Sequence, residues 1–317
     1  MPTVDLWELE QRQALPLETK ERLTAMRIEE WHKHWGGKVY VAFSGGKDST
    51  VLLHQVRRLY PQVDAVFFDS GIEFPEVRAF VKSVENVTWL KPVIPFREVI
   101  EKHGYPVVSK KVARQINDIQ NPTPNNVASR RLYLDGIKKD GSKTKSYKLP
   151  AKWRALAFSD IRVSHKCCGV MKVNPFSRYS AASGNRPYIG TMASESRLRK
   201  QAYLRAGCNS FPGGRDRRII RSTPMAFWTD ADVWEYIHKH GLKYSEIYDM
   251  GEPRTGCMFC MFGVHLEASP NRFQRMEQTH PKHYRYCMDK LKYGRVLDFI
   301  GADYGRKNEQ GYFNLAQ

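Results

Sequence analysis

The sequence predicts an α/β fold, with an open, mostly parallel and twisted sheet that carries helices on both faces. Three short apolar runs are typical of buried strands, at residues 39–43, 65–69 and 86–90. Segments with helical periodicity separate these runs, at residues 48–59 and 75–82. Strands that alternate with helices pair in parallel through right-handed crossovers, and ligands of such sheets bind beyond the carboxyl ends of the strands.

The other elements follow the same logic along the chain. Leucines recur at roughly helical spacing in residues 1–36, which predicts a leading helical region. A helix is expected over residues 96–103 and a further strand over 187–190. Residues 228–238 predict a helix that Thr229 caps.

Composition limits the class of protein. The chain has 317 residues and is 41% hydrophobic, which is enough for one large or two modest domains. No apolar run approaches the 18 residues of a membrane span. Residues 1–20 lack the apolar centre of a signal peptide, so we expect a cytoplasmic protein. The expected organisation is a helical region at 1–36, an α/β domain at 37–300 and a tail at 301–317.

A glycine turn joins the first strand to the first helix, and it consists of Ser44, Gly45, Gly46, Lys47, Asp48 and Ser49. Two glycines allow a tight turn and a close approach of the backbone to a ligand. Backbone N–H groups at the start of the helix then point at one spot, which makes an anion site. The spacing is not that of a Walker A loop, which has four residues between its first glycine and the Gly-Lys pair.

A second polar turn follows the second strand and consists of Asp69, Ser70 and Gly71. Both turns come at carboxyl ends of predicted parallel strands. We therefore expect them to line one pocket.

The positive charge is large and unevenly placed. The net charge is +18, from 51 Lys and Arg against 33 Asp and Glu. A basic insert at residues 108–154 contains twelve Lys or Arg from Lys110 to Arg154 and only three Asp. Residues 197–221 contain eight against one. Such stretches are either solvated basic faces or sites for a polyanion, which would be a multiply phosphorylated nucleotide or a nucleic acid. A nucleic-acid partner would bind through 110–154 and 197–221.

Six cysteines in a cytoplasmic chain indicate metal or redox chemistry rather than disulfides. Four of them form two pairs, Cys167 with Cys168 and Cys257 with Cys260. Four thiolates can hold a zinc ion or an iron–sulfur cluster. Adjacent cysteines suit a single metal ion poorly because their side chains diverge, whereas a 4Fe-4S cluster has separated corners. Unligated thiols remain the third possibility.

These motifs resemble those of a known family. The glycine turn resembles the PP-loop of the adenine nucleotide alpha-hydrolase superfamily, whose fold is Rossmann-like. The segment from Cys167 to Phe176 resembles the cluster-binding Cys-Cys-x-x-x-Lys-Val-x-Pro-Leu of adenosine 5′-phosphosulfate (APS) reductases. Residues 224–237 and 247–257 resemble later motifs of the same enzymes. The resemblance runs from about Val39 to Arg275 and places the chain in the phosphoadenosine phosphosulfate (PAPS) reductase family.

The resemblance implies roles for particular residues. Cluster ligands would come from segments 165–176 and 250–276. The nucleotide would contact the PP-loop and Asp69, Ser70 and Gly71. It would also contact Lys172, Arg199, Arg272 and Arg275, because arginine forks suit phosphate or sulfate.

One departure concerns the nucleophile. The reductases end in Glu-Cys-Gly-Leu-His, whose cysteine attacks sulfur, whereas the last cysteine of this chain is Cys287. Cys208 is a substitute candidate because nearby arginines would lower its pKa, although a buried structural role is the alternative. Cys287 is expected to lie on a helix and to pack against its neighbours.

Three functions are therefore expected, each with an adenine nucleotide (ATP, APS or PAPS). The first is sulfonucleotide reduction with a 4Fe-4S cluster. The second is ATP-dependent sulfur transfer to DNA or tRNA through adenylylation, with Mg²⁺ held by Asp48 or Asp69. The third is a non-catalytic, cluster-bearing nucleotide sensor. A thioredoxin-like or cysteine-desulfurase partner would serve the enzymatic functions.

Overall fold

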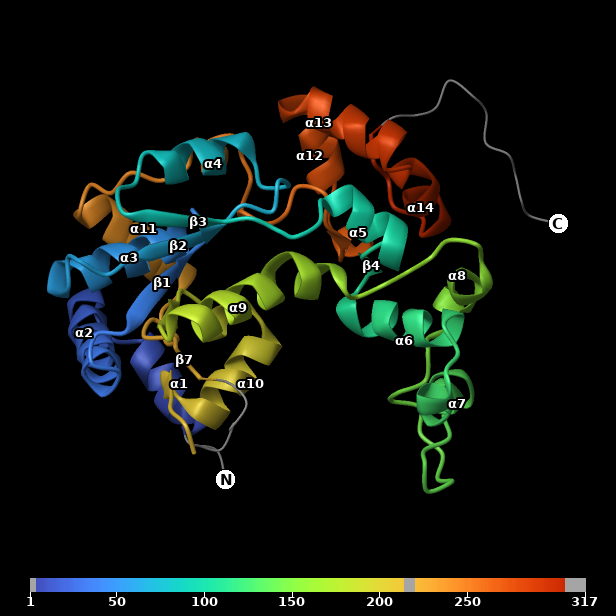
Figure 1. The fold of residues 1–317 in the computed structure, drawn as a ribbon, viewed down its shortest axis with the longest axis horizontal. Helices are drawn as coiled ribbons and strands as arrows, with labels where there is room; N and C mark the ends of the chain where they lie inside the picture. The colour runs from blue at the N-terminus through green and yellow to red at the C-terminus, as the bar shows by residue number, and fades with distance from the viewer. Residues whose placement is uncertain (1–3, 214–219, 306–317) are drawn as a thin grey trace. The chain divides into compact units, whose positions relative to one another are not determined.

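The computed structural model describes residues 4–213 and 220–305, and Figure 1 shows the chain as a ribbon. Predictions for residues 1–3, 214–219 and 306–317 lie outside the described residues. These ranges include part of the basic stretch 197–221 and most of the predicted tail. The chain divides into two compact units that interleave in sequence. Unit 1 comprises Met1–Val93 and Lys172–Thr255, and unit 2 comprises Ile94–Met171 and Gly256–Gln317.

Unit 1 contains a six-stranded sheet in the order β3-β2-β1-β5-β7-β6. All neighbours pair in parallel except β6 and β7, which are antiparallel. The predicted mostly parallel sheet with helices on both faces is confirmed (Figure 1). The strands are β1 Val39–Phe43, β2 Ala65–Phe68, β3 Val87–Leu90, β5 Arg186–Ile189, β6 Asn209–Ser210 and β7 Arg221–Ser222.

The helices of unit 1 surround this sheet. They are α1 Leu6–Gln13, α2 Leu17–His34, α3 Lys47–Leu59, α4 Pro75–Lys82, α9 Asn174–Ser183, α10 Arg197–Ala206 and α11 Asp230–Lys239. Short 3-10 turns are η4 Ala193–Glu195 and η5 Glu246–Tyr248. The π-helix η3 Gly169–Val173 runs across the boundary with unit 2.

The core of unit 1 lies where β1 and β2 meet the apolar face of α3. Val41, Val66 and Leu52 are fully buried there. A buried ion pair joins α2 to α11, because the Lys20 ammonium donates to both carboxylate oxygens of Asp232 at 2.7 Å. The Thr229 hydroxyl accepts from the Asp232 amide and caps α11, as predicted. These contacts fix the position of α11, whose first residue reaches the PP-loop.

Unit 2 is mostly helical around a two-stranded parallel sheet. Its strands are β4 Val107–Val108 and β8 Met261–Phe262. Its helices are α5 Phe96–His103, α6 Lys110–Gln120, α7 Val127–Asp135, α8 Arg154–Phe158, α12 Arg272–Thr279, α13 Pro281–Arg285 and α14 Tyr293–Phe299. Short turns are η1 Pro124–Asn126, η2 Ala151–Trp153, η6 Val264–Leu266 and the π-helix η7 Tyr286–Lys290.

Among the described helices, none is long and apolar enough to span a membrane.

Candidate functional site

The PP-loop lies at the point in the sheet where chain connections diverge. β1 pairs with β2 on one side and with β5 on the other. The loop leaves β1 after Phe43 and enters α3 at Lys47. In parallel sheets, the crevice at such a point receives ligands beyond the strand ends. The strand-end residues Asp69 to Gly71 follow the neighbouring β2, so the two predicted turns do share one edge of the sheet.

Two glycines make the loop possible for different steric reasons. Gly45 has a φ of 71°, and a Cβ there would lie 2.7 Å from Cγ2 of Val81 and 2.8 Å from Cγ1 of Val77. At Gly46 a Cβ would overlap the Thr255 hydroxyl. Since Cβ contacts under 3.0 Å require a shift of the neighbouring atoms, both positions need glycine.

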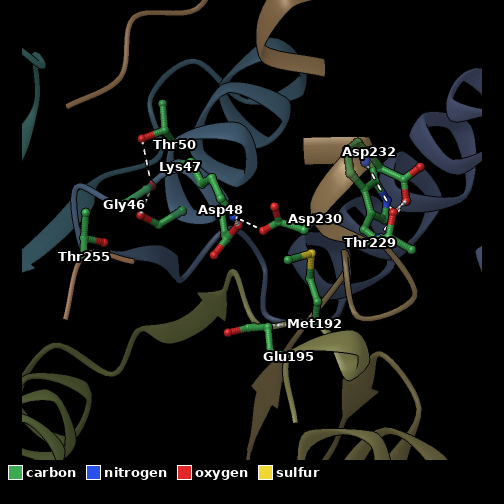
Figure 2. A network of polar contacts seen from close by, with 12 residues as sticks. Gly46, Lys47, Asp48, Thr50, Met192, Glu195, Thr229, Asp230, Asp232 and Thr255 are labelled. Carbon is green, nitrogen blue, oxygen red and sulfur yellow. Dashed lines mark hydrogen bonds and ion pairs between the residues drawn. The ribbon is translucent and has the colours of Figure 1, made fainter. Parts of the chain in front are cut away.

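Internal hydrogen bonds hold the loop in shape. The Ser44 amide donates to Oγ of Ser49 at 3.2 Å, and that hydroxyl donates to the Gly46 carbonyl at 2.9 Å. The Thr50 hydroxyl donates to the same carbonyl at 3.0 Å (Figure 2). The first N–H groups of α3 have no partner within the helix and carry its positive dipole end. The loop therefore has a fixed shape and stands at the positive end of α3, where the sequence predicts an anion site.

Lys47 places a buried positive charge at this loop. Its side chain is 5% exposed, and its ammonium donates to Asp48 at 2.8 Å and to Asp230 at the start of α11 (Figure 2). Burial is the largest single influence and lowers the pKa of Lys47, but Asp48 and Asp230 together outweigh it and raise the pKa above its usual value. The lysine is charged at neutral pH and its position is fixed.

Two contacts at the loop come from far along the chain and were not predicted. Tyr248 accepts a hydrogen bond from the Lys47 amide at 2.9 Å, and Asp230 binds the Lys47 ammonium. Burial raises the pKa of Tyr248, so its hydroxyl stays protonated at neutral pH. Asp230 lies in the first turn of α11, where acidic residues are common because of the helix dipole. Its position in the sequence therefore did not indicate a contact with the PP-loop.

Arg199 lies within electrostatic range of the PP-loop. Burial lowers the pKa of Arg199, Asp48 raises it in part, and the like charges of Arg254 and Arg221 lower it further. Its guanidinium also pairs with Glu195. Arg199 was predicted to bind nucleotide, whereas Arg221 and Arg254 were not singled out. The three guanidinium groups bring excess positive charge to the same part of unit 1.

Ion pairs and hydrogen bonds of two carboxylates, Asp69 and Glu73, stabilise the turn after β2. Asp69 pairs with Arg78 at 2.7 Å and accepts from the Gly71 amide at 3.1 Å. Glu73 accepts from the Ser70 amide at 2.9 Å, and Lys172 lies 3.8 Å from the same carboxylate. Lys172 and the segment from Asp69 to Gly71, both predicted site residues, are therefore linked through Glu73. The sequence analysis did not assign Glu73 this role.

All four paired cysteines belong to unit 2, where one short backbone segment connects both pairs. Tyr105 bridges Val163, four residues before Cys167. Val107–Val108 pairs with Met261–Phe262, directly after Cys260. The segment at residues 105–108 therefore tethers two cysteine pairs that are 89 residues apart in sequence.

Tyr293 lies beside members of both pairs. Its hydroxyl donates to the Phe259 carbonyl at 2.9 Å. Burial raises the pKa of Tyr293, and Cys287, Cys167 and Cys260 raise it further, so all three thiols lie within electrostatic range of its ring. One thiol of each pair is therefore within electrostatic range of the same buried tyrosine.

The six cysteines all lie in the described part of the chain, and none of them forms a disulfide. Among the described residues, no group of three or more His, Cys, Asp or Glu side chains is arranged to hold a single metal ion. The donor set itself consists of four cysteines in two tethered pairs. These four cysteines remain the predicted ligands of a 4Fe-4S cluster.

Arg272 and Arg275 lie in unit 2. Arg272 donates from Nε to Glu267 at 2.8 Å and from Nη1 to the Cys260 carbonyl at 2.9 Å. Arg275 donates to the Pro270 carbonyl at 2.6 Å. Much of the Arg272 fork is thus engaged by Glu267 and Cys260, and its predicted contact with a nucleotide stays a prediction.

The two remaining cysteines are buried. Burial raises the pKa of Cys208 to about 11, although Arg27 and Arg12 lower it in part. Arginines therefore do lower the pKa of Cys208, as expected, but desolvation of the thiolate outweighs their attraction, and the thiol is buried, as the alternative interpretation predicted. Burial raises the pKa of Cys287 to about 12, and its thiol donates to the Tyr284 carbonyl, in line with the expected packing role.

Comparisons with known proteins agree with the motifs. The profile of the phosphoadenosine phosphosulfate reductase domain matches residues 38–115 and 128–262. The adenosine 5′-phosphosulfate reductase of Anoxybacillus flavithermus is 23% identical over 84% of this chain and 91% of its own. That of Geobacillus thermodenitrificans is 22% identical over 82% and 88%.

Two solved structures also resemble the chain. A phosphoadenylyl-sulfate reductase from Candida auris in a phosphate complex is 18% identical, with a TM-score of 0.43 over 77% of this chain and 96% of its own. The U34-tRNA thiolase NcsA from Methanococcus maripaludis, with its 4Fe-4S cluster, is 14% identical, with a TM-score of 0.37 over 89% and 80%. Because the family profile covers more than half of its residues, the chain belongs to the phosphoadenosine phosphosulfate reductase domain family.

Proposed function

We propose that this protein binds an adenine nucleotide at its PP-loop and acts in sulfur metabolism. The observation that carries the proposal is the preformed loop at the end of β1, with the charged Lys47 ammonium buried beside it. Loop amides at a helix start and a fixed cation are the groups that neutralise phosphate oxygens. Membership of the family supports an adenine nucleotide as the ligand.

The surroundings of the loop favour a ligand with more than one anionic group. Arg221 and Arg254 both lie within electrostatic range of Arg199, which pairs with Glu195, and a bound anion would relieve the repulsion between these like charges. Lys47 and the α3 amides would take one phosphate, and the arginines a second phosphate or a sulfate. ATP, APS and PAPS all satisfy this requirement.

Reduction of APS or PAPS is the first candidate reaction. It is supported by the curated relatives, which are APS reductases with more than four fifths of this chain aligned. The reaction releases sulfite together with a nucleoside monophosphate from APS or a nucleoside bisphosphate from PAPS. It consumes two electrons, which a dithiol partner of the thioredoxin type would supply.

A 4Fe-4S cluster would be held by Cys167, Cys168, Cys257 and Cys260. Support comes from the shared backbone tether at residues 105–108 and from the common neighbour Tyr293. When bound, the cluster would supply electrostatic or redox influence on sulfur chemistry. Arg272 would hold the segment around Cys260 through its bond to that carbonyl.

ATP-dependent sulfur transfer is the second candidate, and the state of Cys208 and Cys287 favours it. With pKa values of about 11 and about 12, both thiols are protonated at neutral pH, and both are buried. Neither is suited to attack sulfur in APS or PAPS. In the transfer reaction ATP adenylylates an acceptor and pyrophosphate leaves, after which sulfide from a sulfur donor displaces AMP, so a thiol nucleophile of this kind is not required.

The decisive experiment offers ATP, APS and PAPS in parallel to anaerobically purified protein. Sulfite release with a dithiol selects reduction. Pyrophosphate release that a nucleic acid stimulates selects sulfur transfer. Tight binding without turnover selects a nucleotide sensor. No binding of any of the three contradicts the proposal itself.

A lysine pair provides the matched control for the binding site. Lys47→Met should weaken nucleotide binding about 10- to 100-fold, because a hydrogen bond to a charged group contributes about 1.5–3 kcal/mol. Lys239→Met removes a lysine that also pairs with carboxylates, Glu18 and Glu21, at an exposed position on α11. Its nucleotide affinity should equal that of the parent, as isothermal calorimetry would show.

The cluster is tested separately by colour and iron content. Anaerobic protein should be brown, with about four irons per chain. Cys257→Ser should lose most of the iron, whereas Cys287→Ser should keep it. Equal iron in both variants would contradict the ligand assignment and leave the nucleotide proposal intact.

A further inference from the structure

The basic part of unit 2 has the properties of a binding surface for a polyanion. It comprises α6, α7, the loop that follows α7, η2 and the first residue of α8, and Figure 1 shows α6, α7 and α8 as green segments. Eleven of its twelve Lys and Arg side chains are exposed, with Arg130 half-buried. They are Lys110, Lys111, Arg114, Arg130, Arg131, Lys138, Lys139, Lys143, Lys145, Lys148, Lys152 and Arg154.

These charges are not compensated. Within the described residues none of the twelve forms an ion pair with a carboxylate. Of the three acidic residues in the same stretch, Asp140 is engaged by the Ser142 amide at 2.9 Å and by its hydroxyl at 2.7 Å. A solvated protein face usually mixes both signs of charge, so a concentrated and unpaired positive field favours an anionic partner.

The fold gathers these charges from different parts of the sequence. The Lys111 ammonium donates to the Ser146 carbonyl at 3.0 Å, and Gln115 donates to the Tyr147 carbonyl at 2.6 Å. These bonds attach the loop to α6. A further bond from the Thr144 amide to the Gly136 carbonyl, at 2.7 Å, closes the base of the loop. The charges of residues 138–148 are therefore presented together with those of α6.

An exposed aromatic ring lies among these lysines. Tyr147 is 54% exposed, and the Lys111 ammonium lies 5.8 Å from the centre of its ring. Burying such a ring inside the protein would be favourable, yet here it faces solvent beside cations. Proteins that bind single-stranded nucleic acid combine a basic track along the backbone with aromatic rings on which bases stack.

We infer that this surface of unit 2, residues 110–154, binds single-stranded nucleic acid, with its lysines on the phosphates and Tyr147 stacked against a base. The inference deepens the second candidate reaction by assigning the surface that receives its acceptor. It rests on that proposed function only for its biological role, because binding itself needs neither nucleotide nor cluster.

The test measures fluorescence anisotropy of labelled 20-nucleotide single-stranded DNA and RNA, and of matched duplexes, on the full chain. The parent should prefer the single strands. The triple variant Lys139→Gln, Lys143→Gln, Lys145→Gln should weaken binding at least 10-fold. It should also reduce the slope of log affinity against log salt by about 2, since each lost phosphate contact on a single strand contributes about 0.7.

Tyr147 is tested independently of charge. Tyr147→Ala should weaken single-strand binding about 5- to 100-fold, as expected from loss of one base stack, and leave duplex binding unchanged. Tyr147→Phe should bind like the parent, because the ring and not the hydroxyl stacks. Equal binding by the Ala variant and the parent would overturn the role of the ring.

A charge-matched control separates this surface from the net charge of the protein. Lys33, Lys38 and Lys82 are exposed lysines of unit 1, and their replacement by Gln changes the net charge equally. This control should lose less than 2-fold affinity. Equal losses in both triple variants would overturn the inference, and so would binding to phosphatidylserine vesicles without binding to nucleic acid. Pyrophosphate release assays on the same variants keep the nucleotide proposal separately testable.

Discussion

The PP-loop of unit 1 and the basic surface of unit 2 use positive charge in opposite ways. Lys47 is buried and fixed between two carboxylates, whereas the lysines of residues 110–154 are exposed and form no ion pairs with the described carboxylates. A fixed cation serves a small ligand whose phosphates must occupy one position. Unpaired cations serve a long polymer, which they can contact in many arrangements. The same residue type thus indicates different ligands according to its partners.

The largest expected effect comes from a buried pair in unit 1. Lys20→Met should lower the free energy of unfolding by about 3–5 kcal/mol, because it leaves the Asp232 carboxylate buried without its cation. Urea unfolding followed by circular dichroism measures the change. Lys139→Met, in the basic surface, should change stability by less than about 0.5 kcal/mol. Similar costs at both positions would remove the contrast between the two regions.

Gly45→Ala should have the next largest effect, about 1–3 kcal/mol of stability together with loss of nucleotide binding. The added Cβ combines a positive φ with contacts of 2.7 and 2.8 Å to two valines of α4. Gly184→Ala is the control, with a φ of 73° and no atom within 4 Å of the added Cβ. The difference between the two variants isolates the steric term, and thermal unfolding reports it.

Salt concentration should change the affinity for single-stranded nucleic acid more than the affinity for nucleotide. An increase from 50 to 200 mM salt should weaken single-strand binding at least 10-fold, because several condensed counterions are released on binding. Nucleotide binding at the PP-loop should weaken much less, since buried charges are poorly screened. Anisotropy and calorimetry at matched salt concentrations test this. A steep salt slope for the nucleotide would show that its phosphates lie at an exposed site.

Cys208 gives the smallest effect and tests whether burial outweighs nearby cations. The pKa of Cys208 in the folded protein, about 11, lies above the ordinary thiol value of 9.0. Its stabilising effect is therefore complete below pH 9 and is lost as pH rises through 11. At pH 7.5 iodoacetamide should leave Cys208 unmodified in the native protein and modify it in urea, as mass spectrometry would show. Rapid native modification would indicate a reactive thiolate and restore Cys208 as a nucleophile candidate.

Local patterns in the sequence predicted much of the sheet. Strands β1, β2, β3 and β5 and the helix α11 lie within one or two residues of expectation, because apolar runs and a threonine cap are local signals. The two-residue strands β4, β6, β7 and β8 carry no such signal. Neither unit is continuous in sequence, so no shift in composition marks the point where one ends and the other begins.

The site was predictable to the extent that its residues are sequence neighbours. The loop from Ser44 to Ser49 was identified from six consecutive residues. Its partners Asp230 and Tyr248 are 183 and 201 residues away from Lys47, and only the fold brings them together. The net direction of the Cys208 pKa shift was not predictable for a related reason, because burial depends on long-range packing and the arginines that act on the thiol, Arg12 and Arg27, are distant in sequence.

The hydroxyl of Tyr248 on the Lys47 amide has a consequence for how ligands arrive. A phosphate that approaches this loop meets donors that already have acceptors, the tyrosine oxygen on the amide and two carboxylates on the ammonium. Entry of the proposed nucleotide would therefore be an exchange of acceptors, and its affinity would be the difference between two satisfied arrangements. On its departure, Tyr248, Asp48 and Asp230 would again supply those acceptors from within the chain.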